Sequence, residues 1–435
     1  MPKKYKHNKL PKKLIGAESI FEATSGRFIE KLPPIDYRLQ KPHITEGFQA
    51  VKSNFINKKE MVSLTQDQDL SELKIKFYGQ PKKQMIEKYN IAVYEYKRDE
   101  KAVIGNISTT KIQGQRQSDF ERLEQDIQSY AQNNVLKSYF DTIEDIKPLT
   151  LDEILETDLK KFFEKSPDQK RIIDISFFSH KKELIEEKFN ILSNQHKNNF
   201  ISKVNTQLVH FCRMNLSFSE IKNVVDHFNE IKDISIAPLY FFEKSSASPI
   251  REDVLITSPD PECNPVFVID TACNVNHKVI KNAVVESSNR TTDNNFHGTA
   301  VTSLIVCGAE LSPNGDIIQK NKVITIDADL SRLEEIINEV VLKYHDTYPL
   351  LIVNLSINDY SNQFYNGSKK NNLTVLIDEL SWQYNCLFVI SAGNLFTGET
   401  WSEQMRDICL NMGYPNYFTL PFTAILPPAD SINGV

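Results

Sequence analysis

An aspartate and a histidine in the second half of the chain have the types and spacing of a charge-handling pair. Asp270 ends the apolar run Val266–Ile269, and His297 stands twenty-seven residues later, where an apolar helical pattern begins. An aspartate at the end of a buried strand can orient a histidine and stabilise its imidazolium. It would also offset the helix N-terminus, which disfavours that cation. Together the two residues would form a general base that needs a nucleophile. The alternative is that Asp270 caps a turn and His297 caps a helix.

A side-chain amide adds a third element. The apolar strand pattern 387–391 runs into Ala392 and Gly393, and Asn394 follows. An amide at a strand end can donate to a developing oxyanion, and removing one such donor costs about 3–4 kcal/mol of transition-state stabilisation. Taken alone, an asparagine in a left-handed turn is the simpler interpretation.

The elements around these residues alternate regularly from residue 251 onward. Continuous apolar strand patterns are separated by amphipathic helical ones; the strands are 266–269, 323–326, 350–355 and 387–391, and the helices are 298–307, one from Ser331, and 373–384. Ser331 and Glu334 have capping-box spacing. This alternation predicts an α/β domain with a doubly wound parallel sheet covered on both faces. Sites in such sheets form beyond the carboxyl ends of the strands, so Asp270, Asn354 and Asn394 should share one rim.

The first 250 residues have a different organisation. We expect an irregular N-terminal region over 1–70 with at most one helix, a small α+β unit over 71–150, and a ferredoxin-like unit with a linker over 151–250. The expected strands are 73–77, 91–96, 102–107, 172–178, 208–212 and 234–241, and the expected helices are one after Ser118, 181–192 and 219–231. Strand and helix patterns alternating within about 70 residues favour a split βαβ arrangement. Serines and prolines near residue 250 indicate the main domain boundary.

Four motifs in order, D-T-A, H-G-T-A-V, V-N-L-S and S-A-G-N, resemble those of the subtilisin-like serine peptidases, or subtilases. The resemblance covers residues 262–435. It implies a subtilisin-like fold and a serine-type endopeptidase, a hydrolase acting on polypeptides, with Asp270 as the triad aspartate, His297 as the general base and Asn394 as the oxyanion-hole amide. It also implies a substrate-binding rim formed by Asn354, Leu355, Ser356, Ser391, Ala392 and Gly393. The unit over 151–250 is similar in outline to the folded propeptides of this family.

The chain departs from the family pattern at two places near the site. Ala272 stands where the family has a glycine in the aspartate motif. Ile357, Asn358 and Asp359 stand where the family tends to have glycines that open the S1 region. The form of the specificity pocket therefore does not follow from the resemblance.

The family's nucleophile motif, G-T-S-x-A, does not occur in the 435 residues. One expectation is a truncated or interrupted subtilase, whose serine lies beyond residue 435 and whose 1–435 portion is inactive and poorly soluble. The alternative is a pseudo-peptidase that binds extended peptides or a partner protein. A third hypothesis makes Asp270 the nucleophile of another hydrolase, which would need a metal or phosphate site that no Gly-rich loop or second acidic cluster supplies.

The amino-acid composition argues against several other functions and locations. A net charge of −6 argues against general nucleic-acid binding, although six lysines occur in the first thirteen residues. The basic start lacks the apolar segment of a secretory signal, and no apolar run is long enough for a transmembrane helix. Six cysteines without a C-x-x-C pair predict reduced thiols in the cytoplasm. No metal or cofactor is expected. Similarity to cytoplasmic subtilases with long N-terminal regions implies a possible AAA-type ATPase partner.

Overall fold

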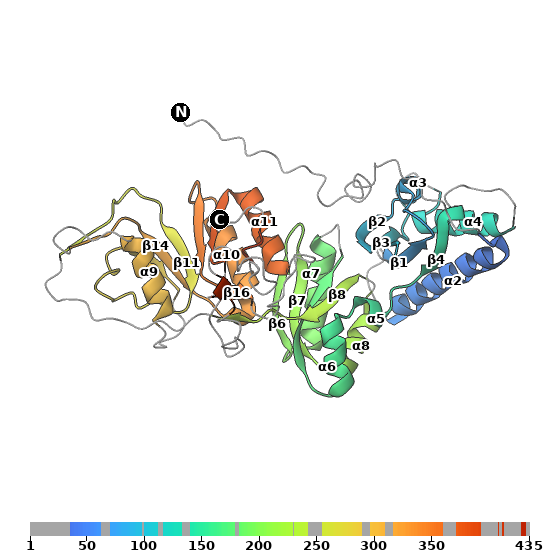
Figure 1. The fold of residues 1–435 in the computed structure, drawn as a ribbon, viewed down its shortest axis with the longest axis horizontal. Helices are drawn as coiled ribbons and strands as arrows, with labels where there is room; N and C mark the ends of the chain where they lie inside the picture. The colour runs from blue at the N-terminus through green and yellow to red at the C-terminus, as the bar shows by residue number, and fades with distance from the viewer. Residues whose placement is uncertain are drawn as a thin grey trace, which may run out of the picture. The chain divides into compact units, whose positions relative to one another are not determined.

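The computed structural model describes residues 35–61, 70–97, 100–111, 116–132, 140–178, 182–228, 230–241, 255–288, 296–308, 316–359, 371–392, 408, 411–412 and 428–431. The chain divides into two compact units. Their helices and strands are labelled in Figure 1. One extends to Arg171 and includes Ile175–Ser179 and Leu216–Ser235; the other comprises Ile172–Asp174, His180–Asn215 and the chain from Ile236 onward. The domain boundaries near residues 70, 150 and 250 stay predictions.

The first unit contains a four-stranded antiparallel sheet of ferredoxin-like topology, with strand order β2-β3-β1-β4. Its elements are β1 (Leu70–Phe77), α3 (Lys83–Lys88), β2 (Ala92–Lys97), β3 (Ala102–Ser108), α4 (Asp119–Gln132), η2 (Phe140–Thr142) and β4 (Ile143–Lys147). The three predicted strands and the helix after Ser118 are confirmed. Ser118 and Glu121 form a capping box at its start, each side chain accepting from the other's backbone N–H. Strand β4 was not predicted.

A long helix, α2 (Tyr37–Met61), lies in the N-terminal region, where the sequence allowed for one helix in otherwise irregular structure. Ile44, Phe48 and Val51 recur at helical spacing and are buried with the core of this sheet. The Gln40 amide donates to the carbonyl oxygens of Phe140 and Ile143, at 3.0 and 2.6 Å. These three residues make a narrow apolar stripe, and Pro42 lies inside the helix, so the helical pattern in the sequence is weak.

A second ferredoxin-like set of elements follows α5 (Leu151–Ile154) and α6 (Thr157–Lys165), as the sequence predicted in outline. Its strand order is β6-β7-β5-β8. The elements are β5 (Arg171–Phe177), α7 (Lys182–Gln195), β6 (Phe200–Asn205), β7 (His210–Leu216), α8 (Phe218–His227) and β8 (Ile231–Ile236). Strand β6 was not predicted. The helix expected over 219–231 ends at His227, because Ile231 already begins β8.

The prediction of a single strand over 234–241 is wrong. It divides into β8, which ends at Ile236, and β9 (Tyr240–Phe241), with Pro238 between them. Proline has no N–H to donate to a strand ladder, so the chain leaves the ferredoxin-like sheet at this point. Strand β9 instead pairs antiparallel with β16 (Asn358–Asp359).

The C-terminal domain has the predicted doubly wound parallel sheet, with strand order β12-β14-β11-β15-β17. Its strands are β11 (Val266–Asp270), β12 (Val284–Ser287), β14 (Val323–Asp327), β15 (Leu351–Leu355) and β17 (Cys386–Ile390), and its helices are α9 (His297–Cys307), η3 (Leu330–Arg332), α10 (Leu333–Tyr344) and α11 (Asn372–Tyr384). A small parallel pair, β10 (Ile256–Thr257) and β13 (Ile317–Ile318), lies outside this sheet. The predicted strands and helices are confirmed, and β12 is additional.

Helices cover both faces of the parallel sheet. Phe267 and Ile269 of β11 belong to a core that includes residues of α10 and α11, whereas Val268 belongs to a second core that includes Val306 of α9. From β11 the chain passes to β12 and β14 on one side, and then to β15 and β17 on the other. The carboxyl ends of β11 and β15 therefore lie at a topological switch point, where such sheets form their sites.

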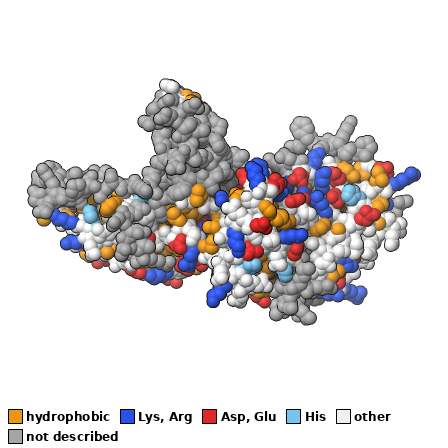
Figure 2. All heavy atoms as spheres, turned by 90° about the horizontal axis from the view of Figure 1, so that it is seen from below, with side chains coloured by type: hydrophobic (Ala, Val, Ile, Leu, Met, Phe, Trp, Pro, Cys, Tyr) orange, Lys and Arg blue, Asp and Glu red, His pale blue; other side chains and the backbone are white. Residues whose placement is uncertain are grey.

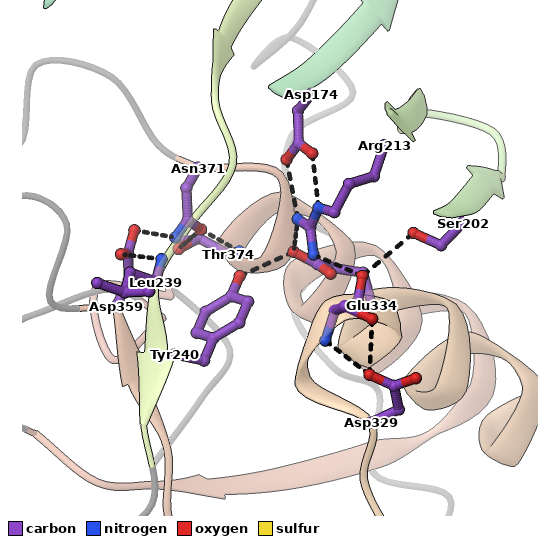
Figure 3. A network of polar contacts seen from close by, with 11 residues as sticks. Asp174, Ser202, Arg213, Leu239, Tyr240, Asp329, Glu334, Asp359, Asn371 and Thr374 are labelled. Carbon is purple, nitrogen blue, oxygen red and sulfur yellow. Dashed lines mark hydrogen bonds and ion pairs between the residues drawn. The ribbon is translucent and has the colours of Figure 1, made fainter. Parts of the chain in front are cut away.

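The capping box predicted from Ser331 and Glu334 is wrong. Asp329 accepts the hydrogen bond from the Ser331 N–H instead, and Glu334 points into a buried ionic network (Figure 3). In that network Arg213 of β7 contacts both carboxylate oxygens of Asp174 on β5, at 2.7 and 2.9 Å, and one oxygen of Glu334, at 2.9 Å. Val204, Val209 and Phe211, from β6 to β7, share one hydrophobic core with α10 and α11 around it.

Other features of the described residues bear on the class of protein. None of their helices is long and apolar enough to cross a membrane. No group of three or more His, Cys, Asp or Glu among them could hold a metal ion. Among the described cysteines, Cys212, Cys263, Cys273, Cys307 and Cys386 form no disulfide bond. On the face shown in Figure 2, acidic and basic side chains of the described residues are interspersed.

We expect Arg213→Ala to lower the free energy of unfolding by about 3–5 kcal/mol, because it leaves two buried carboxylates without their cation. Arg332→Ala is the matched control: Arg332, at the end of η3, is more exposed and pairs with Glu335 in the first turn of α10, so its loss should cost less than about 1 kcal/mol. Urea unfolding of both variants measures the difference. Equal costs would contradict the assigned role of Arg213.

Candidate active site

Asp270 and His297 lie within hydrogen-bonding distance, as predicted. His297 Nδ1 is 2.6 Å from Asp270 Oδ1. The Asp270 side chain is 1% exposed and that of His297 is 13% exposed, so the carboxylate is shielded while the imidazole reaches the surface. With the Nδ1 proton directed at the carboxylate, Nε2 is the basic nitrogen, which is the tautomer that a general base requires.

Thr271 holds the end of the strand and the start of the helix together. Asp270 Oδ1 accepts hydrogen bonds from the Thr271 backbone N–H at 2.7 Å and from its hydroxyl at 3.3 Å. The Thr271 hydroxyl oxygen also accepts from the N–H of Gly298, at 2.8 Å. One threonine therefore orients the carboxylate and anchors the first turn of α9, which carries His297.

Gly298 permits this close approach. A Cβ atom at residue 298 would lie 2.1 Å from the carbonyl oxygen of Thr271, far inside van der Waals contact. Only glycine lets α9 begin against the end of β11. The small residues of H-G-T-A-V thus have a geometric purpose, which is to bring His297 to Asp270.

The carboxyl ends of β15 and β17 form the rim expected beside this pair. Leu355 pairs in register with both Ile269 and Ile390, and its carbonyl oxygen accepts from the Ser391 N–H at 3.1 Å. The amide of Asn354 donates to the Ser356 hydroxyl at 3.0 Å. Asn354, Leu355, Ser356, Ser391 and Ala392 therefore lie on neighbouring strand ends. Gly393 and Asn394 lie outside the described residues.

Asn358 has a role at the rim that sequence reasoning did not assign. Its side-chain amide donates to the carbonyl oxygen of Ser391 at 2.5 Å and is buried. It connects the chain that follows β15 to the chain that follows β17, in the region where the family resemblance implied glycines. The unusual run 357–359 was the signal in the sequence, but its partner could not be read from it.

A thiol lies near the pair but is not suited to nucleophilic attack. Cys273 is buried, and burial raises the pKa of its thiol. A protonated, buried thiol is inert, because the thiolate is the reactive form. Among the described residues the pair therefore has a base and its orienting acid, without an activated cysteine.

We expect Gly298→Ala to destabilise the chain by about 1–3 kcal/mol, against the usual gain from alanine in a helix, because the added methyl group meets the Thr271 carbonyl. It should also shift the NMR resonances of the His297 ring, since the first turn of α9 must move.

Gly308→Ala is the control for this prediction. Gly308 ends α9 with a φ of 67°, so alanine there strains the helix end and not its start. It should lower stability without changing the His297 resonances. Unchanged His297 resonances in Gly298→Ala would contradict the positioning role.

Comparisons with known proteins agree with the motifs. Residues 265–406 match the model of the subtilase family. No curated protein matches the chain.

Two solved structures are similar to parts of the chain. One is the epidermin leader peptide processing serine protease (EpiP) from Staphylococcus aureus, with 15% identity, a TM-score of 0.38, and coverage of 61% of this chain and 68% of that one. The other is a serine-to-alanine mutant of the same protease, with 15% identity, a TM-score of 0.36, and coverage of 61% and 69%. On the family match and the motifs, residues 265–406 are a subtilase-family domain.

Proposed function

We propose that this domain is a serine-type endopeptidase domain, which hydrolyses peptide bonds through an Asp-His-Ser triad. Asp270 and His297 supply two of its members, and the serine comes from polypeptide outside residues 1–435. The observation that carries the proposal is the 2.6 Å contact between His297 Nδ1 and the buried Asp270 carboxylate. The subtilase family match supports it.

In the proposed reaction His297 Nε2 takes the serine proton as the serine oxygen attacks the substrate carbonyl carbon. Asp270 keeps the Nδ1 proton in place and stabilises the imidazolium that forms. The amide of Asn394 donates to the oxyanion. His297 then returns the proton to the leaving amine, and the C–N bond breaks. Water attacks the acyl-enzyme by the same route and regenerates the serine. No cofactor takes part in these steps.

The substrate would bind as an extended strand on the rim. Strand β9 already pairs with β16 in this manner. Backbone pairing supplies affinity in such strand addition, and side-chain pockets supply selectivity. Asn354, Leu355 and Ser356 would lie along one side of the bound peptide. The other side would face Ser391, Ala392 and Gly393.

The second candidate is a pseudo-peptidase that binds extended peptides or a partner protein without cleaving. Two observations favour it: G-T-S-x-A is missing from the 435 residues, and β16 carries an extended segment. The two candidates differ in whether hydrolysis appears once a serine nucleophile is supplied.

A cytoplasmic location and an AAA-type ATPase partner belong to the same proposal. The described cysteines that form no disulfide bond and the lack of C-x-x-C pairs support a reducing compartment. The ATPase partner is supported by the family resemblance alone. Co-purification of an ATPase with the tagged chain from its native cells would test it.

We expect residues 1–435 by themselves to show no turnover of a fluorogenic peptide, because the base has no serine to deprotonate. A chain extended through a G-T-S-x-A segment should hydrolyse the peptide. Robust turnover by residues 1–435 would overturn the assignment of an external serine. A folded, extended chain that binds but does not cleave would favour the pseudo-peptidase.

In the extended chain, His297→Ala should lower kcat on the order of 10⁶-fold, because loss of the general base disables the whole triad. His227→Ala is the matched control: His227 is half-buried at the end of α8, and its ring contacts the Asn223 carbonyl of the same helix. Its kcat should change less than about twofold. Cleavage that survives His297→Ala would show that the base is another residue.

A further inference from the structure

We propose that the pocket holding Tyr240 is a tyrosine-selective subsite for extended polypeptides on the β16 edge. This inference depends on the proposed function, since it names the polypeptide that the rim prefers. Strand β9 is the occupant in the present structure, and it shows what the pocket accepts.

The backbone contacts of β9 are those of a general docking edge. Tyr240 pairs with Asp359 and Phe241 pairs with Asn358 in an antiparallel register. The Asp359 carboxylate also accepts from the Leu239 N–H at 3.2 Å. Main-chain contacts of this kind suit any extended segment, so they cannot by themselves select a sequence.

The side chain of Tyr240 provides the selectivity. It is 4% exposed and belongs to the same buried cluster as Leu333, Leu355 and Ile357. Its hydroxyl donates to Glu334 Oε1 at 2.8 Å (Figure 3). Burial and the charge of Glu334 raise the pKa of Tyr240 well above its usual value, so the hydroxyl remains a donor. The pocket is apolar along its walls and carries a hydrogen-bond acceptor at its end.

Glu334 is fixed as that acceptor. Its side chain is fully buried, and Oε1 also accepts from Arg213 Nη2 at 2.9 Å. Arg213 is itself held by both oxygens of Asp174 and donates to the Ser331 carbonyl at 3.1 Å. The carboxylate therefore cannot turn toward water when the tyrosine is absent.

The hydrogen bonds of Glu334 strengthen the demand for a hydroxyl. Its Oε1 accepts from Arg213 and from Tyr240, and its Oε2 has no hydrogen-bond partner among the described residues. Phenylalanine would fill the same space but would leave Glu334 with one donor fewer. A site built around a substrate hydroxyl rejects the analogue that lacks it, because its own buried polar group is left unpaired.

The test uses the full 435-residue chain with β9 displaced by Tyr240→Ala and Phe241→Pro, which empty the pocket and remove an N–H from the ladder. The probe is a fluorescent peptide of residues 236–243, I-A-P-L-Y-F-F-E, and an analogue with phenylalanine in place of its tyrosine. Fluorescence anisotropy gives the two dissociation constants. We expect the tyrosine peptide to bind at least about tenfold more tightly.

Two further variants of the same chain test which residue causes the preference for the tyrosine peptide. Glu334→Gln should bring the ratio of the two dissociation constants toward one. Asp359→Ala should weaken both peptides alike and preserve the ratio, because it removes the acceptor of the Leu239 N–H, a contact to the peptide backbone. Since the first comparison varies only the peptide, its result does not depend on how well Glu334→Gln folds.

The outcomes separate this inference from the proposed function. Equal binding of the two peptides overturns the tyrosine subsite and leaves peptide binding intact. Failure of both peptides to bind overturns the subsite together with the proposed peptide edge. A tenfold preference for the tyrosine peptide supports the subsite. If the chain extended through a G-T-S-x-A segment still hydrolyses no peptide, the endopeptidase assignment is overturned and the subsite stands.

Discussion

The buried guanidinium of Arg213 is the interaction on which the second compact unit depends. It lies between Asp174 of β5 and Glu334 of α10, and all three side chains are almost completely buried. A charge in that position is tolerated only because its donors meet carboxylates and a carbonyl group. The contact links strands of the ferredoxin-like set to a helix that covers the parallel sheet. It also fixes the carboxylate that receives the Tyr240 hydroxyl, so packing and the peptide edge share one electrostatic centre.

The chemistry of the candidate site arises from a second close approach, at the opposite face of the sheet. Helix α9 begins directly against the end of β11, since Gly298 has no side chain and Thr271 accepts its N–H. That contact sets His297 beside Asp270 at the carboxyl end of the sheet. The pair is therefore held by the backbone of a strand and a helix, which are rigid elements, and its geometry does not depend on a loop. Preorganisation of this kind is what a general base needs.

The peptide edge joins these two centres into one proposed function. Strand β16 follows β15, whose carboxyl end lies next to β11 and hence near the candidate pair. The chain's own β9 lies on that edge, directed there by the break at Pro238 and held through Tyr240 and Leu239. Asn358 meanwhile ties the edge to Ser391. A polypeptide that replaced β9 would pair with β16 in a defined register. One of its side chains would enter the apolar pocket that now holds Tyr240 and ends at the Glu334 carboxylate.

The sequence by itself determined those helices and strands that follow from local patterns of apolar and polar residues. Apolar runs and helical spacing predicted the parallel sheet and its helices, and the ends of the strand patterns predicted one rim for Asp270, Asn354 and Asn394, of which the structure describes Asp270 and Asn354. Tertiary structure decided the rest. Glu334 has the spacing of a capping residue to Ser331, yet its partner Arg213 is 121 positions away. Tyr240 reads as part of a strand, yet its partners are Glu334 and β16. Local periodicity states which side chains are buried, but the energy of a buried polar group depends on which distant partner the closed fold brings to it.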